Sequence, residues 1–171
     1  APGKRPVVFF AHGFGPGDPS VYDSLLRHLA GRGYAVVYGT YPMLRASHAQ
    51  RYDALWNSFS QAASQYAGRL DLTRVAFLGH SYGGGAVPAL AYRGIVEHGW
   101  GSSGALLAEL APWYSYEFAA SQARAFPSRA VQFTEVYDDD AVNDQRMAVD
   151  LYDALPLARK YFVAVRSATV D

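Results

Sequence analysis

The stretch from Arg74 to Gly85 most constrains how this chain can fold. It has the sequence Arg-Val-Ala-Phe-Leu-Gly-His-Ser-Tyr-Gly-Gly-Gly. The apolar run from Val75 to Leu78 has the composition of a short buried strand. It leads directly into a turn with Ser81 at its centre, and helix-forming residues follow. The stretch therefore predicts a strand, a sharp turn and a helix in immediate succession.

The glycines on either side of the serine have a steric explanation. A Gly-x-Ser-x-Gly turn forces its serine into a strained backbone conformation, in which side chains at Gly79 and Gly83 would collide with the strand and the helix. The hydroxyl of Ser81 then stands clear of the sheet, at the N-terminus of a helix whose dipole favours a developing negative charge. This pattern is the nucleophile elbow. Gly84 and Gly85, and the strand before the motif, argue against a chance match.

The composition excludes several classes of protein. A length of 171 residues, half of them apolar, fits one domain with a sizeable core, spanning 1–171. Lys and Arg balance Asp and Glu at 15 each, which argues against nucleic acid or an anionic membrane as a partner. No apolar run approaches the ~20 residues of a membrane span. The absence of cysteine excludes disulfides and cysteine-ligated metals. The compartment stays open, with a secreted or periplasmic location preferred over a cytoplasmic one.

Apolar runs alternate with helical patterns along the chain. Strands are predicted at residues 6–11, 34–38, 75–78, 105–110, 130–136 and 160–165. Helices are predicted after an N-cap at Ser20, and at residues 46–66, 82–97, 116–125 and 144–155, with Pro88 expected to kink the third or shorten its first segment. Continuously apolar strands that alternate with helices predict a mostly parallel sheet covered on both faces, which is a three-layer α/β/α sandwich.

Four motifs, in this order, resemble the α/β-hydrolase superfamily of serine hydrolases. They are His12-Gly-Phe-Gly15, similar to the family's oxyanion loop, the elbow around Ser81, Ala111-Pro-Trp113, and the acidic run Asp138 to Asp140. The Gly-His-Ser-x-Gly-Gly-Gly run, Ala111-Pro-Trp113 and Leu151-Tyr-Asp-Ala-Leu155 are similar to bacterial cutinases and PET hydrolases, and somewhat to dienelactone hydrolases. The resemblance covers nearly the whole chain.

The resemblance implies roles for individual residues. Ser81 would be the nucleophile, and the backbone amides of Phe14 and Tyr82 would hold the oxyanion. Trp113 would border the ester-binding cleft together with Phe14, although a core position suits Trp113 equally well. His12 would be a structural residue of the oxyanion loop rather than a base.

The triad acid is ambiguous between Asp140 and Asp139. Family sequences usually have a branched apolar residue two positions after the acid, which selects Asp140 with Val142. Counting back from Leu151 without a gap selects Asp139 instead. We prefer Asp140, and expect the other aspartates of the run to form a solvated turn.

The expected base is missing from the sequence. A serine triad needs a histidine to take the serine's proton, and in this family it follows the last strand. Here that strand ends near Val165, the chain ends at Asp171, and no histidine follows Asp140. Among the earlier histidines, we expect His80 to point away from Ser81, His28 and His98 to be solvated, and His48 to lack an evident partner. Relative to the family, both ends are expected to be cut, with the base supplied after residue 171, by a C-terminal segment or a second chain.

These features predict serine-dependent hydrolysis of carboxylic esters through an acyl-enzyme. The substrate would be a small-molecule or polymeric ester, and no metal or organic cofactor is implied. The segment between Trp113 and Phe126 is too short for a large lid, so the site should be open. Two alternatives remain. The same triad could hydrolyse amides, thioesters, lactones or dienelactones, or the chain could be a non-catalytic, hydrolase-derived binding protein, which would explain the missing histidine directly.

Overall fold

The computed structural model describes residues 3–15 and 17–166. Within them lies one six-stranded sheet in the order β2-β1-β3-β4-β5-β6, and each neighbouring pair of strands is parallel. The strands are β1 (Arg5–Ala11), β2 (Ala35–Gly39), β3 (Leu70–His80), β4 (Gly104–Leu110), β5 (Ala130–Tyr137) and β6 (Arg159–Val165). The predicted strands are confirmed, although β3 begins earlier than expected.

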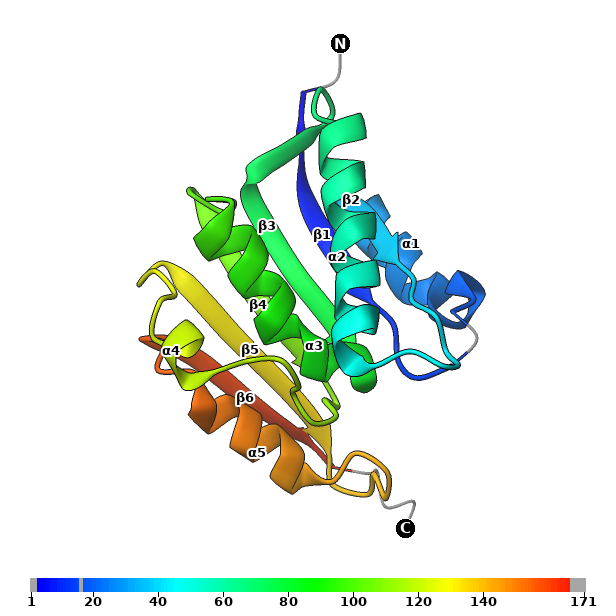
Figure 1. Ribbon diagram of the computed structural model, residues 1–171, viewed down its shortest axis with the longest axis vertical. Coiled ribbons are helices and arrows are strands. Elements are labelled where there is room, and N and C mark those ends of the chain that lie inside the picture. Colours follow the sequence, from blue (N-terminus) through cyan, green and yellow to red (C-terminus); the bar gives the residue numbers. More distant parts are fainter. Residues whose placement is uncertain (1–2, 16, 167–171) are drawn as a thin grey trace.

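Helices connect the strands and cover both faces of the sheet. They are α1 (Asp23–Gly31), α2 (His48–Gln65), α3 (Tyr82–Ala91), α4 (Ala120–Ala123) and α5 (Gln145–Ala154), with a 3₁₀ turn η1 (Pro19–Tyr22) and a π-helical segment η2 (Tyr92–Glu97). In Figure 1, α2, α3 and α5 lie in front of the sheet and α1 lies behind it. This arrangement is the predicted three-layer sandwich.

The front face of the sheet carries a dense aromatic core. Phe9 of β1 is fully buried, and its ring centroid lies 5.1 Å from Phe59 of α2, 5.3 Å from Phe77 of β3 and 5.0 Å from Trp100. Ring pairs at such distances stabilise by ~0.5–1.5 kcal/mol beyond the area that they bury. This core packs across the neighbouring strands β1 and β3, whose carboxyl ends lead to the loop at His12 and to Ser81.

The back face is covered less evenly. Leu78, Ala108, Phe133 and Tyr161 occupy matching positions on β3, β4, β5 and β6. Leu78 and Ala108 are buried, whereas Phe133 is only partly buried and Tyr161 is 58% exposed. Cover on this face therefore fades from the centre of the sheet towards β6.

One helix start differs from the prediction. Asp18, rather than Ser20, caps the first helical segment, and its carboxylate accepts a hydrogen bond from the Ser20 amide at 2.9 Å. Pro19 explains the difference, because proline fits the first helical position and sets the cap immediately before it. The α-helix itself begins only at Asp23, after η1.

Two other helical predictions need correction or refinement. Of residues 116–125, only Ala120–Ala123 are α-helical, because Glu117 has a φ of 52°, outside the helical region. The helix after Ser81 extends to Glu97 as expected, but it changes to a π-helix at Tyr92, four residues after Pro88. The predicted course of the chain towards Asp171 lies outside the described residues. In the described ranges, the longest helices fall short of the length and hydropathy that crossing a membrane requires.

Candidate active site

Ser81 lies between the last residue of β3 and the first residue of α3. Its φ of 53° and ψ of −119° fall outside the regions where a residue with a side chain is relaxed. Three backbone hydrogen bonds hold it there. Its amide donates to the Leu110 carbonyl at 2.9 Å, and its carbonyl accepts from the amides of Gly85 at 3.0 Å and Trp113 at 2.8 Å. Neighbouring segments on both sides thus fix the strained peptide.

Close backbone packing explains the glycines around Ser81. A Cβ atom at Gly79 would overlap the backbone carbonyl of Gly83, and one at Gly83 would overlap the carbonyl of Ala11 in β1. Gly85 has the same role towards the segment after β4, where a Cβ atom would overlap the backbone of Trp113 and its neighbour. The motif predicts the first two requirements, whereas the third becomes evident only in the fold.

The loop after β1 lies directly against the serine. A Cβ atom on Gly13 would lie 3.3 Å from the Ser81 Cβ atom. The next residue, Phe14, has a side chain that is 62% exposed, and its ring meets that of the buried Tyr82 edge-on at 6.1 Å. The two residues predicted to supply oxyanion amides therefore flank Ser81 and touch each other. Tyr82 is the first residue of α3, where backbone N–H groups have no partner within the helix.

His12 occupies a structural position in this loop. It is 1% exposed, and its ring stacks on that of Tyr41 at a centroid distance of 4.3 Å. Burial lowers the pKa of His12, and a 2.6 Å contact between its Nδ1 and the Gly13 carbonyl partly opposes this effect. A buried, neutral ring stacked on Tyr41 fits the predicted structural role of His12 in the loop after β1.

The hydroxyl of Ser81 contacts a residue that the sequence did not indicate. Its Oγ donates to Oδ1 of Asn143 at 3.2 Å, and Nδ2 of Asn143 donates to Oδ2 of Asp140 at 3.2 Å. Asn143 is 6% exposed. A continuous hydrogen-bonded chain therefore joins the serine to the aspartate through an amide. Sequence inspection had no means of finding Asn143, because its position depends on how the loop after β5 folds back.

Asp140, rather than Asp139, takes part in the series of hydrogen bonds that begins at Ser81. Asp140 is partly buried, and its Oδ1 accepts hydrogen bonds from the amides of Val142 at 2.9 Å and Asn143 at 2.8 Å. Desolvation alone would raise the pKa of Asp140, but these bonds and the nearby His80 hold it below its ordinary value. Asp138 and Asp139 are exposed.

The imidazole of His80 contacts Tyr22. Its Nδ1 lies 2.9 Å from the Tyr22 hydroxyl, which also accepts a hydrogen bond from the Gly13 amide at 2.9 Å. Burial lowers the pKa of His80, and the charge of Asp140 opposes this shift. Through the Tyr22 hydroxyl, His80 thus links the turn at Ser81 to the loop after β1.

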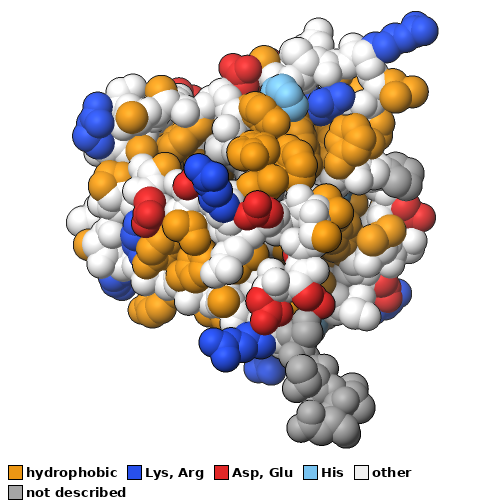
Figure 2. Space-filling model, turned by 90° about the horizontal axis from the view of Figure 1, so that it is seen from below, with side chains coloured by type: hydrophobic (Ala, Val, Ile, Leu, Met, Phe, Trp, Pro, Cys, Tyr) orange, Lys and Arg blue, Asp and Glu red, His pale blue; other side chains and the backbone are white. Residues whose placement is uncertain are grey.

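His48 has partners that the sequence did not reveal. Its Nδ1 lies 3.0 Å from the hydroxyl of Tyr82, and its ring stacks on Tyr116 at 3.6 Å. The guanidinium of Arg51, one helical turn further along α2, lies 5.5 Å from the Phe14 ring and 5.7 Å from the Tyr82 ring. Figure 2 views this end of the molecule and shows hydrophobic side chains gathered beside a histidine and a basic side chain. An aromatic surface therefore borders the serine on the α2 side.

The remaining predicted residues are placed as follows. Trp113 is partly buried and packs against the front core, while its backbone amide holds Ser81. His28 and His98 are exposed, as predicted. Across residues 3–15 and 17–166, the Ser81 hydroxyl bonds to Asn143 and to no imidazole. Over the same residues, no three His, Asp or Glu side chains converge to hold a metal ion.

A buried polar cluster lies between β4 and β5. Glu109 is fully buried, and its Oε2 accepts hydrogen bonds from Thr134 Oγ1 at 2.5 Å and Gln132 Nε2 at 3.0 Å. Desolvation raises the pKa of Glu109 to about 7, against the effect of these bonds and of Lys160. A carboxyl group with this pKa is partly protonated at neutral pH.

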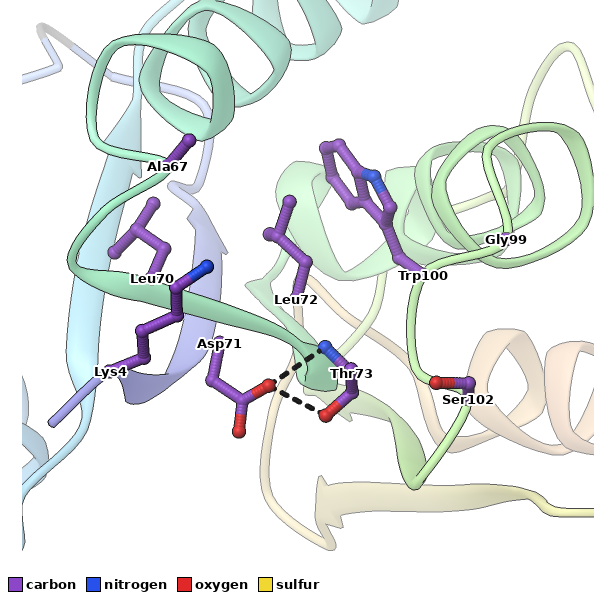
Figure 3. A pocket seen from close by; sticks show the side chains of 9 residues that line it. All are labelled: Lys4, Ala67, Leu70, Asp71, Leu72, Thr73, Gly99, Trp100 and Ser102. Carbon is purple, nitrogen blue, oxygen red and sulfur yellow. Dashed lines mark hydrogen bonds between the residues drawn. The ribbon is translucent and has the colours of Figure 1, made fainter.

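A cavity of about 370 Å³ opens at the opposite end of the strands from Ser81. Its lining includes Lys4, Trp100 and the first residues of β3, whereas Ser81 follows the last residue of that strand (Figure 3). The carboxylate of Asp71 in its wall is already bonded to Thr73 and to Arg74. The cavity is remote from the serine, and its acidic group is satisfied within the protein.

Comparison with known proteins identifies the fold. No family model matches the sequence, and no curated protein matches it. A bacterial heroin esterase is similar in structure, with a TM-score of 0.70 and 15% identity, over 95% of this chain and 66% of that one. SOBER1 of Arabidopsis thaliana has a TM-score of 0.67 and 13% identity, over 98% and 92%. A protein assigned as a dienelactone hydrolase, from Klebsiella pneumoniae, has a TM-score of 0.65 and 18% identity, over 98% and 78%.

These likenesses confirm the predicted α/β-hydrolase fold. At 13–18% identity they establish the fold alone. The chain spans just under two thirds of the heroin esterase.

Proposed function

We propose that the chain forms the core of a serine-dependent hydrolase of carboxylic esters. The backbone of Ser81 carries this proposal, because a φ of 53° at the start of α3 presents a hydroxyl at a cost of ~1–3 kcal/mol. Proteins of similar fold support it by their names, which include a heroin esterase, a carboxyl esterase from Tuber melanosporum, and Est1E from Butyrivibrio proteoclasticus with ferulic acid bound.

The reaction would proceed in two halves. Oγ of Ser81 attacks the ester carbonyl carbon, and the amides of Phe14 and Tyr82 stabilise the resulting oxyanion. The bond to the alcohol oxygen then breaks, and the alcohol leaves with the proton that the serine gave up. Water attacks the acyl-enzyme in the second half and releases the acid.

Two further groups complete this mechanism. Asp140 serves as the acid in preference to Asp139, because it is partly buried and already linked to Ser81 through Asn143. The base is a histidine outside the 171 residues, carried by a C-terminal segment or a second chain. Trp113 and Phe14 border the cleft, as in cutinase-like enzymes, and the same groups would serve for thioester, amide or lactone substrates.

A non-catalytic binding protein is the second candidate. One observation favours it: the Ser81 hydroxyl is bonded to an amide oxygen, which does not accept a proton at neutral pH. The two candidates differ in whether Ser81 can be made to react.

A fluorophosphonate probe distinguishes them. Its phosphorus forms a bond to an activated serine Oγ, and fluoride leaves. We expect one adduct, mapped to Ser81 by peptide mass spectrometry, which forms slowly in the 171-residue chain and rapidly once a histidine-bearing segment is present. The chain alone should hydrolyse p-nitrophenyl butyrate far below the ~10 s⁻¹ typical of enzymes, leaving only a residual rate from the oxyanion hole and binding.

Ser81→Ala is the matched control. Undiminished labelling in that variant would remove Ser81 as the nucleophile. Ordinary turnover by the 171-residue chain alone would place the base among its five histidines, with His12 and His48 tested first. No labelling under any condition would favour the binding protein.

A further inference from the structure

We propose that the side chain of Asn143 occupies the position of the general base and holds Ser81 in an unreactive resting state. The base must displace the Asn143 side chain before Ser81 can react. This inference rests on the proposed function, and it adds a positioning residue to that site. The starting observation is the chain Ser81 Oγ to Asn143 Oδ1 to Asp140 Oδ2, with both links at 3.2 Å.

The amide of Asn143 reproduces the contacts of a neutral imidazole. An imidazole in a triad accepts from the serine on one nitrogen and donates to the acid from the other. The side-chain amide accepts from Ser81 on its oxygen and donates to Asp140 from its nitrogen. The reverse orientation would set Oδ1 against a carboxylate oxygen, which is repulsive because the pKa of Asp140 is lowered and the group is ionised.

The amide of Asn143 cannot act as a general base in the way that an imidazole does. Its oxygen is not basic enough to take the serine's proton, so Ser81 remains a neutral hydroxyl. The hydroxyl has one proton and can donate it to one acceptor at a time. A base that activates Ser81 must therefore take over the hydrogen bond that Asn143 now accepts.

Burial and local anchoring favour exchange of the side chain alone. Asn143 is 6% exposed, so an incoming ring and its amide compete for the same enclosed space. The backbone of the loop is pinned independently, because Asp140 binds the amides of Val142 and Asn143, and Asp144 caps α5 through the Arg146 amide. The side chain of Asn143 can rotate away while the loop and the acid remain in place.

External imidazole tests the proposal on the chain as it exists. Asn143→Ala removes the amide and leaves room for a small ring between Ser81 and Asp140. We expect saturable, imidazole-dependent fluorophosphonate labelling of Ser81 in Asn143→Ala, at least about tenfold faster than in the unsubstituted chain at the same imidazole concentration. Adding Asp140→Asn to Asn143→Ala should abolish saturation, because the ring loses the carboxylate that orients it. Loss of a merely structural contact would produce no such dependence on imidazole and Asp140.

A second variant tests the same position in another way. Asn143→His places an imidazole on the same loop, and labelling of Ser81 should then rise with pH through the titration of that ring, without added imidazole. Circular dichroism on each variant confirms that it is folded. Equal imidazole dependence in Asn143→Ala and the unsubstituted chain would overturn the inference while Ser81 is still labelled. Absence of labelling in every variant would overturn the proposed function, and this inference with it.

Discussion

Ser81 and Asp140, the proposed nucleophile and acid, both follow the carboxyl ends of strands in the sheet, but different forces hold them. Around Ser81, every residue of α3 is buried, and Gly79 and Gly83 bring backbone against backbone. Around Asp140, only two of the ten residues of α5 are fully buried, and side-chain hydrogen bonds organise the loop.

This difference teaches where each part of the site can change. Backbone packing tolerates almost no added atom, because protein interiors are close-packed and neither strand nor helix can move alone. A hydrogen-bonded loop can exchange one side-chain partner for another at ~1 kcal/mol. Ser81 is therefore fixed with the fold, whereas the surroundings of Asp140 can be adjusted residue by residue.

The largest expected effect comes from Gly79→Ala. The added methyl group overlaps the backbone of Gly83, so the variant should lose about 3 kcal/mol or more of unfolding free energy. Gly31→Ala is the matched control, because nothing lies within 4 Å of a Cβ atom there. Urea denaturation measures both. Equal stabilities of the two variants would show that the elbow is less rigid than its packing implies.

A smaller effect, which depends on pH, is expected at Glu109 on the acid side. Its pKa is about 7 in the folded state, above the ordinary value of 4.5, so the folded state binds more protons between these values and stability falls as pH rises through that window. Glu109→Gln keeps an acceptor for Thr134 and Gln132 and removes this penalty.

Thermal or urea unfolding at pH 4 and pH 8 measures the difference between the Glu109→Gln and parent chains. At pH 8 the variant should be more stable than the parent by about 2–3 kcal/mol relative to their difference at pH 4. A difference that does not change with pH would show that the pKa of Glu109 is the same in the folded and unfolded chains. Comparing the two chains at each pH cancels the contribution of the histidines.

The smallest effect separates Asp140 from Asp139. Asp140→Asn removes a charge that raises the pKa of His80, so that pKa should fall further. The substitution should also lower the free energy of unfolding by ~1 kcal/mol, because it weakens hydrogen bonds within the loop. Asp139→Asn should change neither quantity measurably. Histidine titration by NMR gives the pKa, and a larger shift from Asp139→Asn would transfer the acid's role to Asp139.

Local sequence patterns were sufficient for the architecture and for the close-packed glycines beside Ser81. Apolar runs in β1, β3, β4 and β5 identify buried parallel strands without knowledge of their neighbours. The requirement for Gly79 follows from chain sterics within five residues, so a motif can express it, whereas the close neighbour of Gly83 is Ala11 of β1. The cap at Asp18 was missed because Pro19, rather than the hydroxyl of Ser20, decides where the first helical segment begins.

The acid side was less predictable because its contacts are distant in the sequence. Asn143 meets Ser81 across 62 residues. An asparagine in a polar loop has no local pattern that distinguishes it from a solvated one. Glu109 likewise sits in an apolar strand whose polar partners come from β5, so only the strand register reveals its cluster.

Glycine would form the corner at position 81 more easily than serine does. It reaches a φ of 53° and a ψ of −119° without the clash that a Cβ atom introduces, so a single substitution would relax the turn. Each folded molecule instead bears ~1–3 kcal/mol of strain there, a sizeable share of the ~5–15 kcal/mol that typically separates folded from unfolded chains. A turn that served only to connect β3 to α3 would gain nothing from this backbone strain. The hydroxyl is the one group that a glycine could not supply, and it is what the strain secures.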